Sequence, residues 1–90
     1  MKIVFESSFK RDLKKIKDRR ILLKVKEILE SFEKAKTLAD LRDIDIRKMR
    51  IEGKYYRVRI GDYRIGIEQG EKQIIFVRIL HRKEIYRYFP

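Results

Sequence analysis

Three arginines occupy the part of the sequence with the clearest strand pattern. In residues 55–68, apolar and polar residues alternate on both sides of the dipeptide Gly61-Asp62. A two-residue Gly-Asp connection between alternating runs predicts a β-hairpin whose register pairs Arg59 with Arg64. Because side chains alternate between the two faces of a strand, Arg57, Arg59 and Arg64 then share one face. We expect this face to bind a phosphate group, which planar guanidinium groups recognise through paired hydrogen bonds.

The shared face has an energetic cost that favours a bound anion. Like charges directly opposite on a sheet are destabilising, with cross-strand pair terms of about 0.2–1 kcal/mol. The alternative is a solvated charged face, which is typical of charge runs. The formal net charge of +11, and arginine rather than lysine at all three positions, favour phosphate recognition. Gly66 falls opposite Arg57, where its missing side chain would leave room for a ligand or for close approach of backbone.

Further candidates follow the last expected strand. His81, Arg82 and Lys83 add hydrogen-bond donors at the edge of the arginine face, and His81 is the one histidine of the sequence. Its role, catalytic or structural, stays open. Tyr86 and Tyr88 lie two residues apart on an expected helical turn, so only one of them can face the arginines. A tyrosine beside several cations can accept a proton or stack on a base.

Composition excludes other kinds of chemistry. The sequence has no cysteine, so thiolate zinc sites and cysteine nucleophiles are impossible. The acidic stretch 40–45 is interrupted by Arg42 and lacks a glycine to shape a calcium loop. The longest apolar run, 74–77, is far too short to cross a bilayer. We therefore expect a cytoplasmic protein with no membrane partner, no metal and no cofactor.

Helices are expected in the first half of the chain. The first 52 residues contain no glycine and no proline, and such residues punctuate loops and turns. A short β-prone segment at 2–6 precedes an amphipathic helix over 9–17, for which Ser7-Ser8 are candidate N-caps. Asp18 can cap a second, longer helix that ends around Lys36. Together these segments predict a helical hairpin.

The second half predicts a sheet. Apolar spacing in 37–50 drifts between periods 3 and 2, so its structure stays open. After the hairpin of 55–68, the nearly continuous apolar run of 73–80 suits a central strand covered on both faces. An aromatic tail closes the chain at 84–90. The whole chain, 1–90, is predicted to be one α+β domain, with two N-terminal helices packed on one face of a small antiparallel β-sheet and a short C-terminal helical tail.

Two sequence stretches, YRVRIGDYRI at 56–65 and HRKEIY at 81–86, resemble the RelE/ParE superfamily of type II toxins. The resemblance covers nearly the whole chain and includes the lysine-rich helix KRDLKKI at 10–16. It implies a RelE-like, ribosome-dependent endoribonuclease that cuts mRNA in the ribosomal A site. It also implies an acidic, RelB-like antitoxin as partner, and no small-molecule cofactor.

The resemblance implies roles for individual residues. Arg57 and Arg59 match a cationic pair, lysines in the best-known branch, on the strand before the turn. Arg64 matches the arginine after the turn and Arg82 the arginine after the last strand. Tyr86 matches the tyrosine near the C-terminus. Arg64 and Arg82 are then expected to stabilise the phosphate. Arg57 and Arg59 would stabilise charge and position the RNA backbone.

The implied reaction is attack of the ribose 2′-hydroxyl on the adjacent phosphorus. Arginine is a poor general base because it stays protonated, so the proton acceptor is Tyr86, His81 or a group on the ribosome. Two other functions stay open: a ParE-like toxin that inhibits gyrase on the same fold, and a non-catalytic module that binds RNA or the ribosome.

Overall fold

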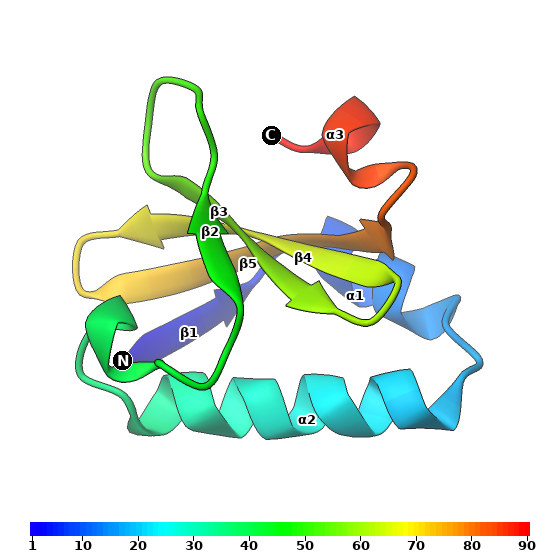
Figure 1. Ribbon diagram of the computed structural model, residues 1–90, viewed down its shortest axis with the longest axis horizontal. Coiled ribbons are helices and arrows are strands. Elements are labelled where there is room, and N and C mark those ends of the chain that lie inside the picture. Colours follow the sequence, from blue (N-terminus) through cyan, green and yellow to red (C-terminus); the bar gives the residue numbers. More distant parts are fainter.

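A five-stranded β-sheet with strand order β1-β5-β4-β3-β2 forms the centre of the fold (Figure 1). The computed structural model describes all of residues 1–90. The elements along the chain are β1 (Lys2–Phe5), α1 (Ser7–Lys14), α2 (Arg19–Lys34), the 3-10 turn η1 (Leu38–Asp40), β2 (Ile46–Lys48), β3 (Tyr55–Ile60), β4 (Tyr63–Gly70), β5 (Gln73–His81) and α3 (Ile85–Tyr88). The α+β class, the two N-terminal helices and the short C-terminal helix are as predicted.

The sheet is mixed rather than purely antiparallel. Strands β2 to β5 form an antiparallel meander, but β1 pairs with β5 in parallel, from Lys2 opposite Gln73 to Phe5 opposite Phe76. The predicted antiparallel sheet is wrong for this one pair. The two strands are far apart in the sequence, and nothing in a local alternation pattern specifies the direction in which distant strands meet. As predicted, β5 is a central strand.

Helix α1 covers the edge of β5 beyond the end of β1. Its N-cap is Glu6, which makes no side-chain capping bond, so the predicted Ser7-Ser8 caps are wrong. Both serines lie inside the helix, and the Ser8 hydroxyl donates to the carbonyl oxygen of Val77 at 2.6 Å. This bond satisfies part of a strand edge that would otherwise be unpaired.

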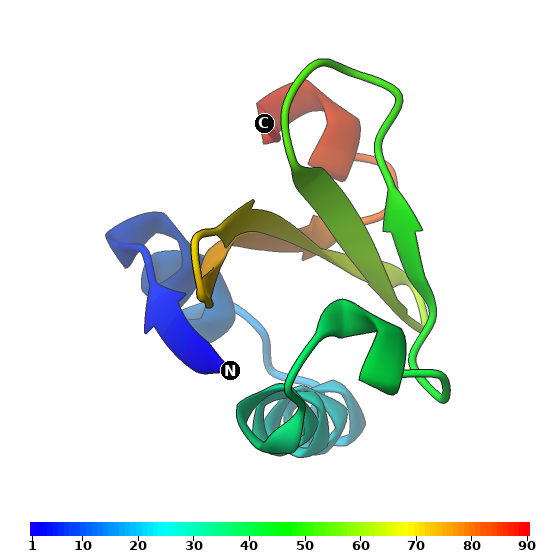
Figure 2. The same cartoon turned by 90° about the vertical axis from the view of Figure 1, so that its left-hand side faces the viewer.

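Helix α2 lies across one face of the sheet (Figures 1 and 2). Asp18 caps it as predicted, with its carboxylate accepting a hydrogen bond from the Arg20 amide at 2.9 Å. Val25 and Phe32 are buried against the sheet, and the helix ends at Lys34. None of the helices has the length and apolar character needed to cross a membrane.

The predicted hairpin register is confirmed. Arg59 lies opposite Arg64, and Arg57 lies opposite Gly66. The alternate residues belong to the core beneath the sheet, where Val58 is fully buried. These core residues are Val58, Ile60, Ile65 and Ile67. Because strand side chains alternate, the arginines project from the face that α2 does not cover.

Helix α3 packs on this second face of the sheet (Figure 2). Ile85 and Phe89 are both buried. A Cβ atom at Gly66 would lie 2.5 Å from two atoms of the Phe89 ring. The room predicted at Gly66 is therefore occupied by Phe89, and the glycine admits an aromatic side chain of the chain's own tail rather than a ligand or backbone.

Candidate active site

A cavity of about 140 Å³ opens on the face of the sheet that α2 leaves uncovered, and every residue that lines it is charged. Strands β2, β3 and β4 and the residue before β2 supply the lining. The lining residues are Asp45, Arg47, Arg57, Arg59 and Arg64. We call the four arginines the arginine cluster. One carboxylate among four guanidinium groups gives the cavity a net positive charge, which suits an anion.

Most of the arginine cluster has no acidic partner. Arg57, Arg59 and Arg64 form no ion pair with any carboxylate of the chain. Arg47 approaches Asp45, with 3.5 Å between Nε and Oδ1. The Arg47 and Asp45 side chains are 69% and 41% exposed, and exposed ion pairs contribute little. Three cations are thus available to an anion without first breaking an internal salt bridge.

Arg64 is held in place by the hairpin turn. Its Nη1 donates to the carbonyl oxygens of Gly61 and Tyr63, at 2.8 and 2.9 Å. Partial burial, followed by repulsion from Arg59 and then Arg57, lowers the pKa of Arg64 from its ordinary value. The lowered pKa reports an environment that disfavours further positive charge, and a bound anion would relieve it.

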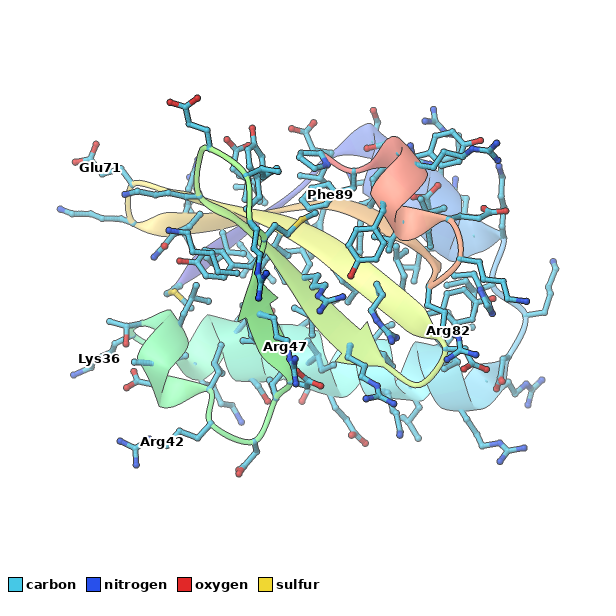
Figure 3. The ribbon with its side chains drawn as sticks, turned by 45° about the horizontal axis from the view of Figure 1, so that its top comes forward. Lys36, Arg42, Arg47, Glu71, Arg82 and Phe89 are labelled. Atoms are coloured by element: carbon cyan, nitrogen blue, oxygen red, sulfur yellow. The ribbon has the colours of Figure 1, made fainter.

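Arg82 lies at the edge of the arginine cluster. Its backbone amide donates to the Asp62 carbonyl oxygen at 2.7 Å, which joins the end of β5 to the β3–β4 turn. Its Nε is 3.9 Å from the Asp62 carboxylate, and both side chains are exposed. Figure 3 shows Arg47 and Arg82 on the same side of the sheet, with the β3–β4 hairpin between them. Arg82 also contributes to the lowered pKa of Arg64.

The two tail tyrosines point to different partners, so only one of them meets the arginine cluster, as predicted. The ring of Tyr86 lies 5.4 Å from the guanidinium carbon of Arg57. Tyr88 instead lies 5.5 Å from the guanidinium carbon of Arg78 on β5. Tyr86 is 57% exposed, so a ligand on the cluster can reach it.

His81 lies on the other side of the sheet. It pairs in register with Tyr63, whose side chain packs against the core under α2, and the two rings are 5.8 Å apart. Its Nδ1 accepts a hydrogen bond from the Lys83 amide at 3.2 Å. The structure therefore does not bring His81 together with the arginine cluster.

The sequence and fold of this chain have known relatives. Residues 3–86 match the sequence profile of the ParE toxin of the type II toxin–antitoxin system parDE. The chain belongs to the RelE/ParE superfamily of type II toxins. It is 46% identical over 90 residues, the full length of both chains, to Toxin RelE3 of Methanocaldococcus jannaschii. The chain is thus a RelE-family toxin of a type II toxin–antitoxin system.

Solved structures of RelE-family toxins are similar to it. In the crystal structure of the RelB–RelE antitoxin–toxin complex from Methanococcus jannaschii, the matching chain is 42% identical, with a TM-score of 0.83 and coverage of 97% of this chain and 99% of that one. The toxin–antitoxin complex RelBE2 from Mycobacterium tuberculosis contains a chain that is 25% identical, with a TM-score of 0.66 and 90% coverage of both chains.

Sequence reasoning missed two residues of this toxin's cavity, Asp45 and Arg47. Strand β2 pairs with β3 and places Arg47 directly opposite Arg57. A weak signal is present, since Ile44 and Ile46 alternate with these two polar residues. The strand is only three residues long, and its register depends on the loop that follows, so a local pattern could not identify it.

Proposed function

We propose that this toxin is a ribosome-dependent endoribonuclease that cleaves mRNA in the ribosomal A site without a metal ion. The observation that supports it most is the group of unpaired guanidiniums, Arg57, Arg59 and Arg64, around a cavity beside an exposed tyrosine. Attack on a phosphodiester adds negative charge to the phosphorus centre. Fixed cations aimed at that charge lower the barrier, because they stabilise the transition state more than the ground state.

The proposed reaction is an internal transesterification. The ribose 2′-oxygen forms a bond to the adjacent phosphorus, and the bond from phosphorus to the 5′-oxygen of the next nucleotide breaks. A base accepts the 2′-hydroxyl proton, and a proton is delivered to the departing 5′-oxygen. The products are a 2′,3′-cyclic phosphate and a 5′-hydroxyl end.

Each residue has a proposed part in this reaction. Arg64, fixed by the hairpin turn, and Arg82 stabilise the phosphate, while Arg57 and Arg59 stabilise developing charge and position the RNA backbone. Tyr86 is the base or a stacking platform for a nucleobase, and a ribosomal group is the alternative base. His81 has no part, because it lies on the opposite face of the sheet. Arg47, opposite Arg57, adds a further cation for the RNA backbone.

The requirement for the ribosome follows from how little of the substrate such a site can hold. The cavity has a volume of about 140 Å³ and five lining residues, too small to enclose several nucleotides. Holding reactants in the right geometry can remove about 7–11 kcal/mol from a barrier. The ribosome would supply this by presenting the mRNA in one conformation.

The proposed partner of the free toxin is an acidic antitoxin that resembles RelB. Two similar structures are complexes of a RelE toxin with its antitoxin, and a net charge of +11 favours an anionic partner. Action on ribosomes and mRNA places the toxin in the cytoplasm, with no membrane involved.

The test is to add the purified toxin to translating ribosomes and map mRNA 5′ ends by primer extension. We expect new ends in register with codons. Arg64→Gln should lower the single-turnover rate by about 10²–10³-fold, as loss of one transition-state donor does. Arg42→Gln is the matched control, because it removes the same charge at an exposed position outside the cavity lining, and Figure 3 shows it pointing away from Arg82.

A supercoiling assay with DNA gyrase, run in parallel, tests the ParE-like alternative. Loss of supercoiling without mRNA cuts would replace the nuclease by a gyrase poison. Ribosome binding with neither activity would leave a binding module. Cuts that Arg64→Gln and Arg42→Gln reduce equally would show that the net charge matters and the arginine cluster does not.

A further inference from the structure

An ion pair between α1 and β5 lies outside the arginine cluster, and its arginine contacts Tyr88 of α3. Asp12 of α1 is 3% exposed and is the one charged residue of the chain that is buried. Its Oδ2 accepts from Nε of Arg78 at 2.7 Å and its Oδ1 from Nη2 at 3.0 Å. Oδ2 also accepts from the Ile79 amide at 3.2 Å. The Arg78 guanidinium is therefore fixed in one orientation by a two-pronged contact.

The second fact is where Arg78 lies in the sheet. Across β3, β4 and β5, one register row reads Arg57, Gly66, Arg78. All three positions carry a part of the tail: Tyr86 lies at Arg57, the Phe89 ring lies on Gly66, and Tyr88 lies at Arg78. Each of the three aromatic rings of the tail therefore contacts one position of this row.

Helix α3 depends on these contacts with the sheet for its orientation. It is a single turn of four residues with no side-chain N-cap bond, and so short a helix is not stable on its own. Ile85 and Phe89 fix its depth on the sheet because both are buried. Ile85 begins the turn and Phe89 is its C-cap, so they anchor its two ends and not its exposed tyrosines. Tyr86 and Tyr88 lie on opposite flanks, so a contact at Tyr88 fixes the direction of Tyr86.

We propose that Arg78, held by Asp12, is a positioning residue that acts through Tyr88 to set Tyr86 at the arginine cluster. The inference rests on the proposed nuclease function for its catalytic consequence. Arg78 does not bind the RNA phosphate itself, because Asp12 already occupies its guanidinium. Helix α1 is thereby connected to the active site. Asp12 of α1 orients Arg78, Arg78 fixes the position of Tyr88, and the helical turn then sets the direction of Tyr86.

The test removes the contact between Tyr88 and Arg78 and leaves the Asp12–Arg78 ion pair in place. Tyr88 is 51% exposed, so Tyr88→Ala should fold normally, and a denaturation curve checks this. We expect the single-turnover cleavage rate at saturating toxin to fall about two- to fivefold, the size of an exposed cation–π contact. The toxin concentration for half-maximal rate should stay unchanged. Tyr88→Phe, which keeps the ring, should restore the rate.

A double-variant comparison shows whether Tyr88 acts through Tyr86. In a Tyr86→Ala background, Tyr88→Ala should have no further effect on the rate. A structural readout is independent of cleavage: the Nε–H signal of Arg57 in an NMR spectrum, which the Tyr86 ring shifts. Tyr88→Ala should move this signal toward its position in Tyr86→Ala, and Tyr88→Phe should not.

The two proposals fail in different ways. If the wild-type toxin cuts no mRNA, the nuclease function fails, and the Arg57 signal still decides the positioning role. If Tyr88→Ala leaves that signal unchanged, or slows cleavage equally with and without Tyr86, the positioning role is wrong whether or not the toxin is a nuclease.

Discussion

Replacing Gly66 by alanine tests how α3 is held on the sheet. A Cβ atom there would lie 2.5 Å from Cγ and Cδ2 of Phe89 and 2.7 Å from Cδ1. Carbon atoms do not approach so closely, so the ring must leave its seat. Phe89 is 2% exposed, and burial of a phenylalanine side chain contributes about 1.5–3 kcal/mol. Alanine in place of glycine stabilises the folded protein by about 0.4–1 kcal/mol, because it lowers the conformational entropy of the unfolded chain.

The expected net effect of Gly66→Ala is a loss of about 0.5–2.5 kcal/mol in the free energy of unfolding, measured by urea denaturation. Gly70→Ala is the matched control on the same strand. Its Cβ would meet the flexible Gln73 side chain, whose Cγ is 3.1 Å away, and that side chain can move aside. We expect its unfolding free energy to stay within about 0.5 kcal/mol of the wild type.

Repeating Gly66→Ala in a Phe89→Ala background shows whether the loss of stability comes from the clash with the Phe89 ring. Without the ring there is nothing for the new methyl group to displace. Gly66→Ala should then be neutral or stabilise the protein by up to about 1 kcal/mol. An equal loss in both backgrounds would refute the argument, because the steric conflict with Phe89 would then not be the origin of the effect.

Three further predictions concern stability. Arg59→Gln should raise the free energy of unfolding at low salt by about 0.2–1 kcal/mol, because it removes a like-charge pair across the hairpin; a decrease would contradict this. Asp18→Ala should lower it by about 1 kcal/mol through loss of the α2 N-cap, in the same urea assay. Hydrogen bonds from the amides of Lys36 and Thr37 lower the pKa of Asp40 below 3.8. The stability that Asp40 contributes is thus present above that pH and lost as the pH falls through the folded pKa, so wild type and Asp40→Asn should converge in acid; a constant difference would exclude this linkage.

The hairpin face was predictable because two local rules suffice for it. A two-residue turn fixes the register of β3 and β4, and strand alternation fixes the face of each side chain. Arg57, Arg59 and Arg64 follow from these rules, and the structure gathers them at one cavity. The Asp18 cap followed in the same way from a residue type beside an amphipathic run.

What the sequence did not predict depends on contacts between distant segments. Ser8 has the residue type of an N-cap, but its hydroxyl bonds a strand 69 residues away. The direction of β1 relative to β5 depends on the path of the chain between these two strands. Gly66 is open in a hairpin considered by itself and is filled only when the tail folds back with Phe89. The spacing of residues within one segment cannot predict any of these distant partners.

Arg57 and Arg78 show why residue type and face together do not identify a functional arginine. Both occupy the same register row, on either side of Gly66, and each lies against one tyrosine of α3. Arg78 is neutralised by a buried carboxylate from α1, and Arg57 has no carboxylate partner. A phosphate therefore gains by approaching the Arg57 side of α3 and gains little on the Arg78 side. The position of Asp12, 66 residues before Arg78 in the sequence, thus determines which end of the row is open to an anion and which end is already paired.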